Sequence, residues 1–219
     1  MLSTLPKENR TTHNKILNCY ISTSLTKSAC MKMLQKILTV CLLIILTATC
    51  TDDIENEYAS HRAYLRYTNV ATTAPLRTAL DNPGMFCTIR YDNRYYYFAG
   101  SDGTAAQQPR TAADNYGTPM SIAGFIVGTP AVPNLSSGTH TAAAYDLVCP
   151  TCYANDAIER SLMFDYAYSA GNIMKCYRCM TSYDLNASGI PINGKEESRR
   201  LFKYRLSYSP ATGTMVIQN

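Results

Sequence analysis

The sequence of 219 residues contains no tryptophan and only three histidines, His13, His61 and His140. The sequence also has no Ser/His/Asp set and no carboxylate pair whose spacing argues for catalysis. An enzyme is therefore the least supported class of function.

Clustered positive charge is missing from most of the chain. The formal net charge is +4, but residues 1–50 contain six Lys/Arg and one Glu, which gives +5, and residues 51–219 contain fourteen Lys/Arg and fifteen Asp/Glu, which gives −1. A nucleic-acid-binding surface needs an excess of basic residues on one face. The sequence therefore predicts no nucleic-acid partner.

The apolar run from Ile37 to Ala48 is about 12 residues long, which is too short to span a bilayer and is typical of a signal peptide. Lys32 and Lys36 form its basic flank. We therefore interpret residues 31–49 as a signal peptide, with a buried helix as the alternative. Residues 1–30 are polar and without pattern, and they fit an upstream extension that a misplaced start codon would add.

The apolar run ends in Leu46-Thr47-Ala48-Thr49-Cys50, which resembles the lipobox of bacterial lipoproteins. The resemblance implies acylation of Cys50 and a lipid anchor in the outer membrane, on its periplasmic or its surface-exposed side. The acidic residues 51–57 resemble the export signal of surface lipoproteins, although such a run is also typical of a solvated linker. Residues 50–60 are expected to be the lipidated cysteine and a polar tether, and residues 61–219 the folded domain.

Beyond the tether, short runs rich in aromatic and apolar residues alternate with turn signals, and helical periodicity is poor. This pattern predicts an all-β domain of stacked antiparallel sheets. Residues 100–119 are expected to form a long loop, and residues 156–162 at most one helical turn. Hairpin turns are expected at residues 92–94, 169–171 and 210–213, between strands over residues 62–67, 86–91, 95–99, 120–127, 141–148, 161–168, 172–175, 201–208 and 214–218.

Four of the five cysteines after Cys50 form two CxxC pairs, Cys149-Pro150-Thr151-Cys152 and Cys176-Tyr177-Arg178-Cys179. A CxxC turn places both sulfur atoms on one side of a tight loop, and two such loops can supply four thiolates to Zn²⁺ or iron. One or two disulfides are the alternative in an oxidising compartment. The fifth cysteine, Cys87, lies in a strand-like run and is expected to be a small buried hydrophobic residue.

The second pair belongs to Cys176-Tyr177-Arg178-Cys179-Met180-Thr181-Ser182-Tyr183-Asp184-Leu185, which resembles the second cluster-binding loop of Rieske iron–sulfur (ISP) domains. Cys176 falls on the cysteine of that pattern, Cys179 on its histidine, and Tyr183-Asp184 on its aromatic–Asp pair. The resemblance covers roughly residues 124–219. It implies a Rieske-like fold with the two CxxC loops adjacent at one tip, in a metal-loop subdomain of about residues 145–185.

A Rieske centre uses two cysteines and two histidines as ligands, and no histidine of this chain falls on a ligand position. His140 precedes Cys149 by nine residues and is expected to be an ordinary strand-edge residue. The expected ligands are therefore all cysteine: Cys149, Cys152, Cys176 and Cys179.

Zinc is the favoured metal for this ligand set. The leader lacks a twin-arginine pair and so resembles a general secretory signal, and zinc can bind after an unfolded chain has crossed the membrane. The function expected on this basis is a structural or binding role. The alternative is an electron-transfer protein with a 2Fe–2S cluster or a single iron.

Overall fold

The structure is a computed structural model that describes residues 57–111, 117–134, 137–167, 171–194 and 197–219. The chain divides into two compact units, Met1–Glu55 and Asn56–Asn219, and all described residues belong to the second unit. The expected signal peptide, Cys50 and most of the acidic tether lie outside the described residues.

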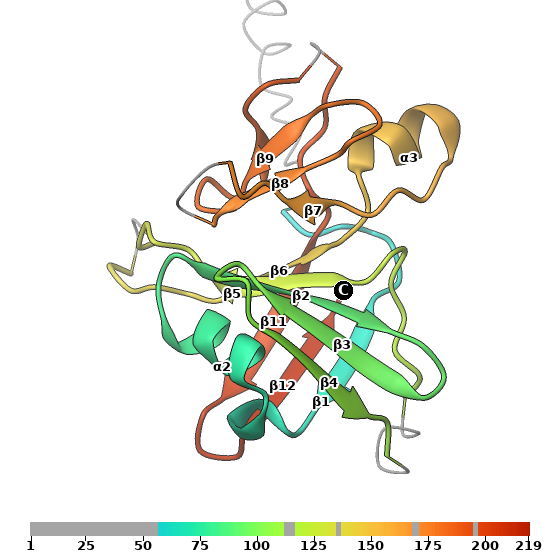
Figure 1. Ribbon diagram of the computed structural model, residues 1–219. Helices are drawn as coiled ribbons and strands as arrows, with labels where there is room; N and C mark the ends of the chain where they lie inside the picture. Colours follow the sequence, from blue (N-terminus) through green and yellow to red (C-terminus); the bar gives the residue numbers. More distant parts are fainter. Residues whose placement is uncertain (1–56, 112–116, 135–136, 168–170, 195–196) are drawn as a thin grey trace, which may run out of the picture. The chain divides into compact units, whose positions relative to one another are not determined.

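Two antiparallel sheets make up the described part of the chain (Figure 1). The large sheet has the strand order β1-β12-β11-β6-β5-β2-β3-β4, and the small sheet has the order β10-β9-β8-β7. The all-β class expected from the sequence is confirmed. The strands of the large sheet are β1 (Tyr64–Tyr67), β2 (Met85–Tyr91), β3 (Tyr95–Gly100), β4 (Ala105–Pro109), β5 (Phe125–Thr129), β6 (Ala143–Asp146), β11 (Lys203–Ser209) and β12 (Thr214–Gln218).

The central strands of the large sheet contribute side chains to two hydrophobic cores, one on each face of the sheet. In β2, Phe86 packs into one core and Cys87 into the other, and in β5 the same is true of Ile126 and Val127. This follows from strand geometry, because successive side chains point to opposite faces. Strands β5 and β6 are buried at every position for the same reason.

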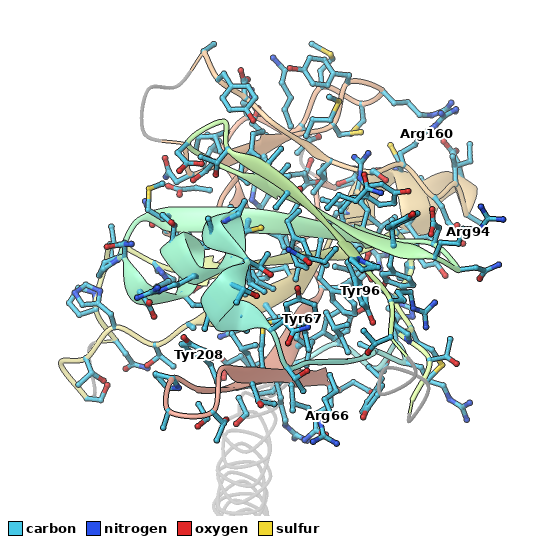
Figure 2. The ribbon with its side chains drawn as sticks, turned by 60° about the horizontal axis from the view of Figure 1, so that its bottom comes forward. Arg66, Tyr67, Arg94, Tyr96, Arg160 and Tyr208 are labelled. Carbon is cyan, nitrogen blue, oxygen red and sulfur yellow. The ribbon has the colours of Figure 1, made fainter. Side chains whose placement is uncertain are left out.

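The first core lies between the large sheet and a short helix, α2 (Ala74–Asp81), which follows the 3-10 turn η1 (Val70–Thr72). The helix buries Leu76, Ala79 and Leu80, which is the spacing of one helix face. Figure 2 shows Tyr67 and Tyr96 next to each other in this core, and their ring centroids are 5.4 Å apart. The sequence did not predict α2, because two helical turns give too few repeats to stand out as a period.

The second core lies between the large sheet and the small sheet, and it contains the cysteines of the two CxxC pairs. Phe86, Ile126 and Tyr145 of the large sheet pack here with Phe164 and Tyr183 of the small sheet. Figure 1 shows helix α3 (Pro150–Asp156) beside β8 and β9. The strands of the small sheet are β7 (Met163–Phe164), β8 (Ile173–Lys175), β9 (Ser182–Asp184) and β10 (Ile190–Pro191).

The hairpins expected from turn signals are confirmed for β2–β3 and β11–β12, which pair as antiparallel neighbours. At the first turn, the backbone N–H groups of Arg94 and Tyr95 donate to Oδ1 of Asp92 at 2.7 and 2.8 Å. Strands β7 and β8 also pair in antiparallel fashion. Residues 168–170, which include most of the turn expected between them, lie outside the described residues.

Four expectations about local structure were wrong, and the first is the strand over residues 161–168, which is reduced to the two residues of β7. Strand β4 occupies part of the expected loop over residues 100–119, because β3 offers it a partner along its whole length. The strand expected over residues 120–127 begins only at Phe125. The helix near the first CxxC pair precedes the expected position: α3 ends at Asp156, and Ala157 turns the chain with a left-handed φ of 53°.

Candidate metal centre

The first cysteine loop, residues 149–152, follows strand β6 and consists of the N-cap residue and the first three residues of helix α3. The N–H of Cys149 donates to the carbonyl of Arg160 at 2.7 Å, and the N–H of Leu162 donates to the carbonyl of Leu147 at 2.8 Å. The chain before and after α3 is therefore held side by side. Cys149 is the N-cap residue of α3, and Pro150 follows it, where the missing N–H of proline costs no helical hydrogen bond. Cys152 then lies in the first turn of the helix.

The second cysteine loop, residues 176–179, joins β8 to β9. The N–H of Cys176 donates to the carbonyl of Thr181 at 2.9 Å, and the N–H of Met180 donates to the carbonyl of Cys176 at 2.8 Å. Met180 has a φ of 62°, in the left-handed region that closes such a turn. Because β8 and β9 pair directly next to this loop, both of its cysteines are fixed by the small sheet.

The two cysteine loops meet, and the four sulfur atoms of Cys149, Cys152, Cys176 and Cys179 all lie within 4.8 Å of one another. The Sγ atoms of Cys149 and Cys179 are 3.5 Å apart, and those of Cys152 and Cys176 are 3.7 Å apart. Both of these contacts join one loop to the other. The four cysteines singled out by their spacing in the sequence therefore form one cluster.

Three hydroxyl groups surround the cluster. The hydroxyl of Tyr183, on β9, lies 3.4 Å from Sγ of Cys149 and 3.0 Å from Oγ1 of Thr151. Oγ1 of Thr151 also accepts a hydrogen bond from the N–H of Arg199 at 3.4 Å. On the other loop, Oγ1 of Thr181 lies 3.3 Å from Sγ of Cys179. The hydroxyls of Tyr183 and Thr181, which lie next to sulfur atoms, can donate to thiolates and orient them.

Burial makes ionisation of two of the four thiols unfavourable without a cation. Burial raises the pKa of Cys149 to about 11, even though the Tyr183 hydroxyl opposes the shift. The pKa of Cys152 is also raised, first by burial and then by the charge of Cys149. At Cys179, burial acts in the same direction, but hydrogen bonds from Thr181 and the neighbouring thiols outweigh it and lower the pKa to about 7. Four thiolates this close together therefore need a positive ion to balance their charge.

The sulfur positions fit one tetrahedral metal ion. Zinc–sulfur bonds of about 2.3 Å in a regular tetrahedron place the sulfur atoms about 3.8 Å apart. Two of the separations here are 3.5 and 3.7 Å, and all of them are within 4.8 Å. A disulfide needs a separation of about 2.0 Å, and all five described cysteines are free. The cluster can therefore hold a metal ion.

The other residues considered from the sequence lie apart from this cluster. Cys87 is fully buried in the first core, as expected, and burial raises the pKa of its thiol. His140 is exposed, with Nδ1 3.0 Å from the carbonyl oxygen of Pro130. His61 packs against the rings of Tyr153 and Phe202. The group of close metal-binding side chains found among the described residues contains cysteines alone.

The contact between Thr181 and Cys179 and the hydrogen bond between Thr151 and Tyr183 were not predicted from the sequence. Thr151 lies inside one CxxC pair and Thr181 lies two residues after the other, so their proximity in sequence was a usable signal. Tyr183 was part of the Rieske-like pattern, but its contact with the first cysteine loop spans 34 residues. A single sequence carries no sign of such a long-range contact.

Comparison with known proteins adds no family to this picture: no family model matches the chain, and no curated protein matches it. Within the described residues, no helix has the length and apolar character needed to cross a bilayer.

Proposed function

We propose that the protein is an exported, lipid-anchored β-domain on a Rieske-like frame, in which one zinc ion bound by the two cysteine loops has a structural role. The loops would present their surface to a binding partner in the cell envelope. The observation that carries this proposal is the group of four sulfur atoms within 4.8 Å, contributed equally by two loops far apart in sequence.

Zinc is preferred over a two-iron cluster because of the sulfur separations. A 2Fe–2S cluster with four cysteine ligands places two thiolates on each iron. Sulfur atoms bound to different irons must therefore lie further apart than two sulfur atoms bound to one tetrahedral ion. Here the sulfur atoms are close enough for one ion. A structural zinc site of this kind stabilises the fold directly.

Metal analysis of protein purified from its native envelope tests the proposal. We expect one zinc per chain and four thiols that become titratable after chelation without a reductant. Two irons with acid-labile sulfide would overturn the zinc assignment. Absence of metal together with disulfides among the four cysteines would overturn the metal site itself.

A single iron in an electron-transfer protein is the second candidate, and the hydroxyls around the sulfur atoms favour it. Hydrogen bonds to thiolate ligands tune the reduction potential of iron–sulfur sites, and the hydroxyls of Tyr183 and Thr181 lie 3.4 and 3.3 Å from sulfur atoms. Visible absorption separates the candidates, because iron–thiolate centres are coloured and zinc sites are not. A colourless protein with bound zinc would exclude the electron-transfer role.

The lipid anchor is supported by the lipobox-like residues that end at Cys50. Mass spectrometry of the purified protein tests it. We expect an N-terminal, acylated Cys50. A mature chain that retains residues 37–49, or an unmodified Cys50, would contradict the anchor without affecting the metal site.

A further inference from the structure

The four cysteines differ in their access to solvent. The side chains of Cys149, Cys152 and Cys176 are 0%, 4% and 1% exposed, whereas Cys179 is partly exposed. Tyr177 and Met180, on either side of Cys179, are also exposed, at 58% and 54%. A reagent that approaches from solvent therefore meets the sulfur of Cys179 before the other three.

The two shortest sulfur–sulfur separations identified in the cluster join one loop to the other. Sγ of Cys179 is 3.5 Å from Sγ of Cys149, and Sγ of Cys152 is 3.7 Å from Sγ of Cys176. The two pairs need to close by about 1.5 and about 1.7 Å to reach a disulfide bond length. Side-chain rotation can supply a movement of this size, since all four sulfur atoms already occupy one small volume.

Building on the metal site proposed above, we propose that the centre is also an oxidation site, which exchanges its metal for two cross-loop disulfides. The Cys149–Cys179 bond forms first and the Cys152–Cys176 bond second. The oxidant is a small-molecule or protein disulfide.

The first bond forms by thiol–disulfide exchange in two steps. The thiolate of Cys179 attacks one sulfur of the oxidant, the S–S bond of the oxidant breaks, and one thiolate leaves. The thiolate of Cys149 then attacks Sγ of Cys179, and the second half of the oxidant leaves as a thiolate. Two protein thiolates have lost two electrons in total, and one oxidant disulfide has gained them.

The second bond follows because the remaining pair can no longer hold the ion alone. Cys152 and Cys176 lose two further electrons to a second oxidant molecule by the same exchange. In both the metal-bound and the oxidised state, helix α3 is tied to the β8–β9 hairpin. The domain therefore keeps its loop arrangement while it releases its metal.

The experiment uses the zinc-loaded full chain and oxidised glutathione. Zinc release is followed with a coloured chelator, and samples quenched with an alkylating agent are digested with trypsin without reduction. Cleavage after Arg160, Lys175 and Arg178 leaves Cys149 and Cys152 in one peptide but separates Cys176 from Cys179. Cross-loop bonds link the first peptide to each of the other two, whereas bonds within each CxxC pair link only the Cys176 and Cys179 peptides.

Two variants resolve the order of the steps. In Cys149→Ser the resolving thiol is missing, so we expect a mixed disulfide between glutathione and Cys179 to accumulate. In Cys179→Ser we expect modification of the remaining three cysteines by oxidised glutathione, read from the peptide map rather than from zinc release, to slow at least tenfold. Cys87→Ser is the matched control, because Cys87 lies in the other core, and its zinc release should equal that of the parent.

The outcomes separate this inference from the proposed function. Disulfides within each CxxC pair, or a first adduct on a cysteine other than Cys179, would overturn the inference and leave the metal site intact. Zinc that stays bound in the presence of oxidised glutathione would also overturn the inference and leave the metal site intact. If the reduced chain binds no zinc, the proposed function fails, and the peptide map of the oxidised chain still decides the pairing.

Discussion

The hydroxyl of Tyr183 lies 3.4 Å from Sγ of Cys149 and 3.0 Å from Oγ1 of Thr151, so one buried side chain of β9 contacts the first cysteine loop at two atoms. The ring of Tyr183 is completely buried in the second core. Strand β9 also begins at Ser182, three residues after the last cysteine of the second cysteine loop. Tyr183 therefore fixes the position of one loop relative to the other.

Replacing Tyr183 with Phe should weaken metal binding without emptying the core. The ring is retained, but Cys149 loses a hydrogen-bond donor and Thr151 loses a partner. Groups that orient metal ligands in this way typically account for about tenfold to 100-fold in affinity. Competition with a chelator of known zinc affinity measures the effect.

Tyr67→Phe is the matched control for that substitution. Its hydroxyl is 2.6 Å from Oγ1 of Thr73 in a buried pair of the first core. We expect Tyr67→Phe to lower the free energy of unfolding and to leave zinc affinity unchanged. Equal zinc affinities for Tyr183→Phe and the parent would show that the hydroxyl does not orient Cys149.

Removal of the metal should loosen one part of the domain selectively. Helix α3 and the β8–β9 hairpin are joined at the cysteine cluster, which belongs to the second core, on the opposite face of the large sheet from the first core. At a free zinc concentration a thousandfold above the dissociation constant, binding stabilises the native state by about 4 kcal/mol. Hydrogen exchange with and without chelator should show loss of protection in residues 150–156, 173–175 and 182–184.

Strands β2 and β3 serve as the internal reference in that measurement. They pair along their length in the large sheet, and their amides should keep their protection after chelation as long as the domain remains folded. Uniform loss of protection across both sheets would mean that the cluster stabilises the domain as one unit rather than locally.

The elements predicted correctly from the sequence are those whose signals are local. Strands β2 and β3 carry runs of β-forming residues around a turn at Asp92, and that turn is closed by hydrogen bonds within four residues. The ligands of the cluster were also a local signal, because each loop contributes two cysteines spaced by two residues.

The elements that were missed depend on distant partners. Strand β4 has the sequence AAQQP, which has weak strand propensity, and it is extended because β3 pairs with it. Helix α2 is recognisable once its apolar face is seen against β2 and β5. The contact between the two cysteine loops depends on the packing of the small sheet on the large one, which the spacing of cysteines alone does not specify.

Met180→Gly should stabilise the second cysteine loop. Met180 has a left-handed φ of 62°, and its side chain is 54% exposed. An L-residue in this conformation costs about 1–2 kcal/mol, and the greater freedom of glycine in the unfolded chain offsets part of the gain. We expect a net increase in the free energy of unfolding of up to about 1 kcal/mol, measured by denaturant titration at saturating zinc.

Met163→Gly is the control for loss of an exposed methionine. Met163 is 55% exposed, but it lies in strand β7, where glycine is unfavourable by about 0.5–1 kcal/mol. The two substitutions should therefore change stability in opposite directions. A decrease of similar size in both would mean that the backbone at Met180 is not strained.

Asp146→Asn should change how stability depends on pH. Burial raises the pKa of the Asp146 carboxyl, although hydrogen bonds from the N–H groups of Ile122, Val148 and Ala123 and from the Tyr204 hydroxyl oppose it. The folded state then takes up a proton more readily than the unfolded state. The stabilising contribution of this group is present below the unfolded pKa of about 4 and is lost as pH rises through the folded pKa.

In the Asp146→Asn variant, the free energy of unfolding should lack this dependence on pH. The variant should also be less stable than the parent at every pH. Oδ2 of Asp146 accepts from Ile122 and Tyr204, and an amide NH₂ in its place cannot accept either hydrogen bond, which costs about 1–3 kcal/mol. The free energy of unfolding, measured between about pH 3 and pH 8, gives the difference from the parent at each pH.

Asp92→Asn provides a comparison, because the pKa of Asp92 is shifted in the opposite direction to that of Asp146. Backbone N–H groups of Arg94 and Tyr95, followed by the Tyr97 hydroxyl, lower the pKa of the exposed Asp92 carboxyl. Its contribution is therefore present above the unfolded pKa and is lost as pH falls through the folded pKa. The difference from the parent should shrink with rising pH for Asp146→Asn and with falling pH for Asp92→Asn. If the difference in free energy of unfolding between the parent and Asp146→Asn stays constant across the acid range, the Asp146 carboxyl of the parent has the same pKa in the folded and the unfolded chain.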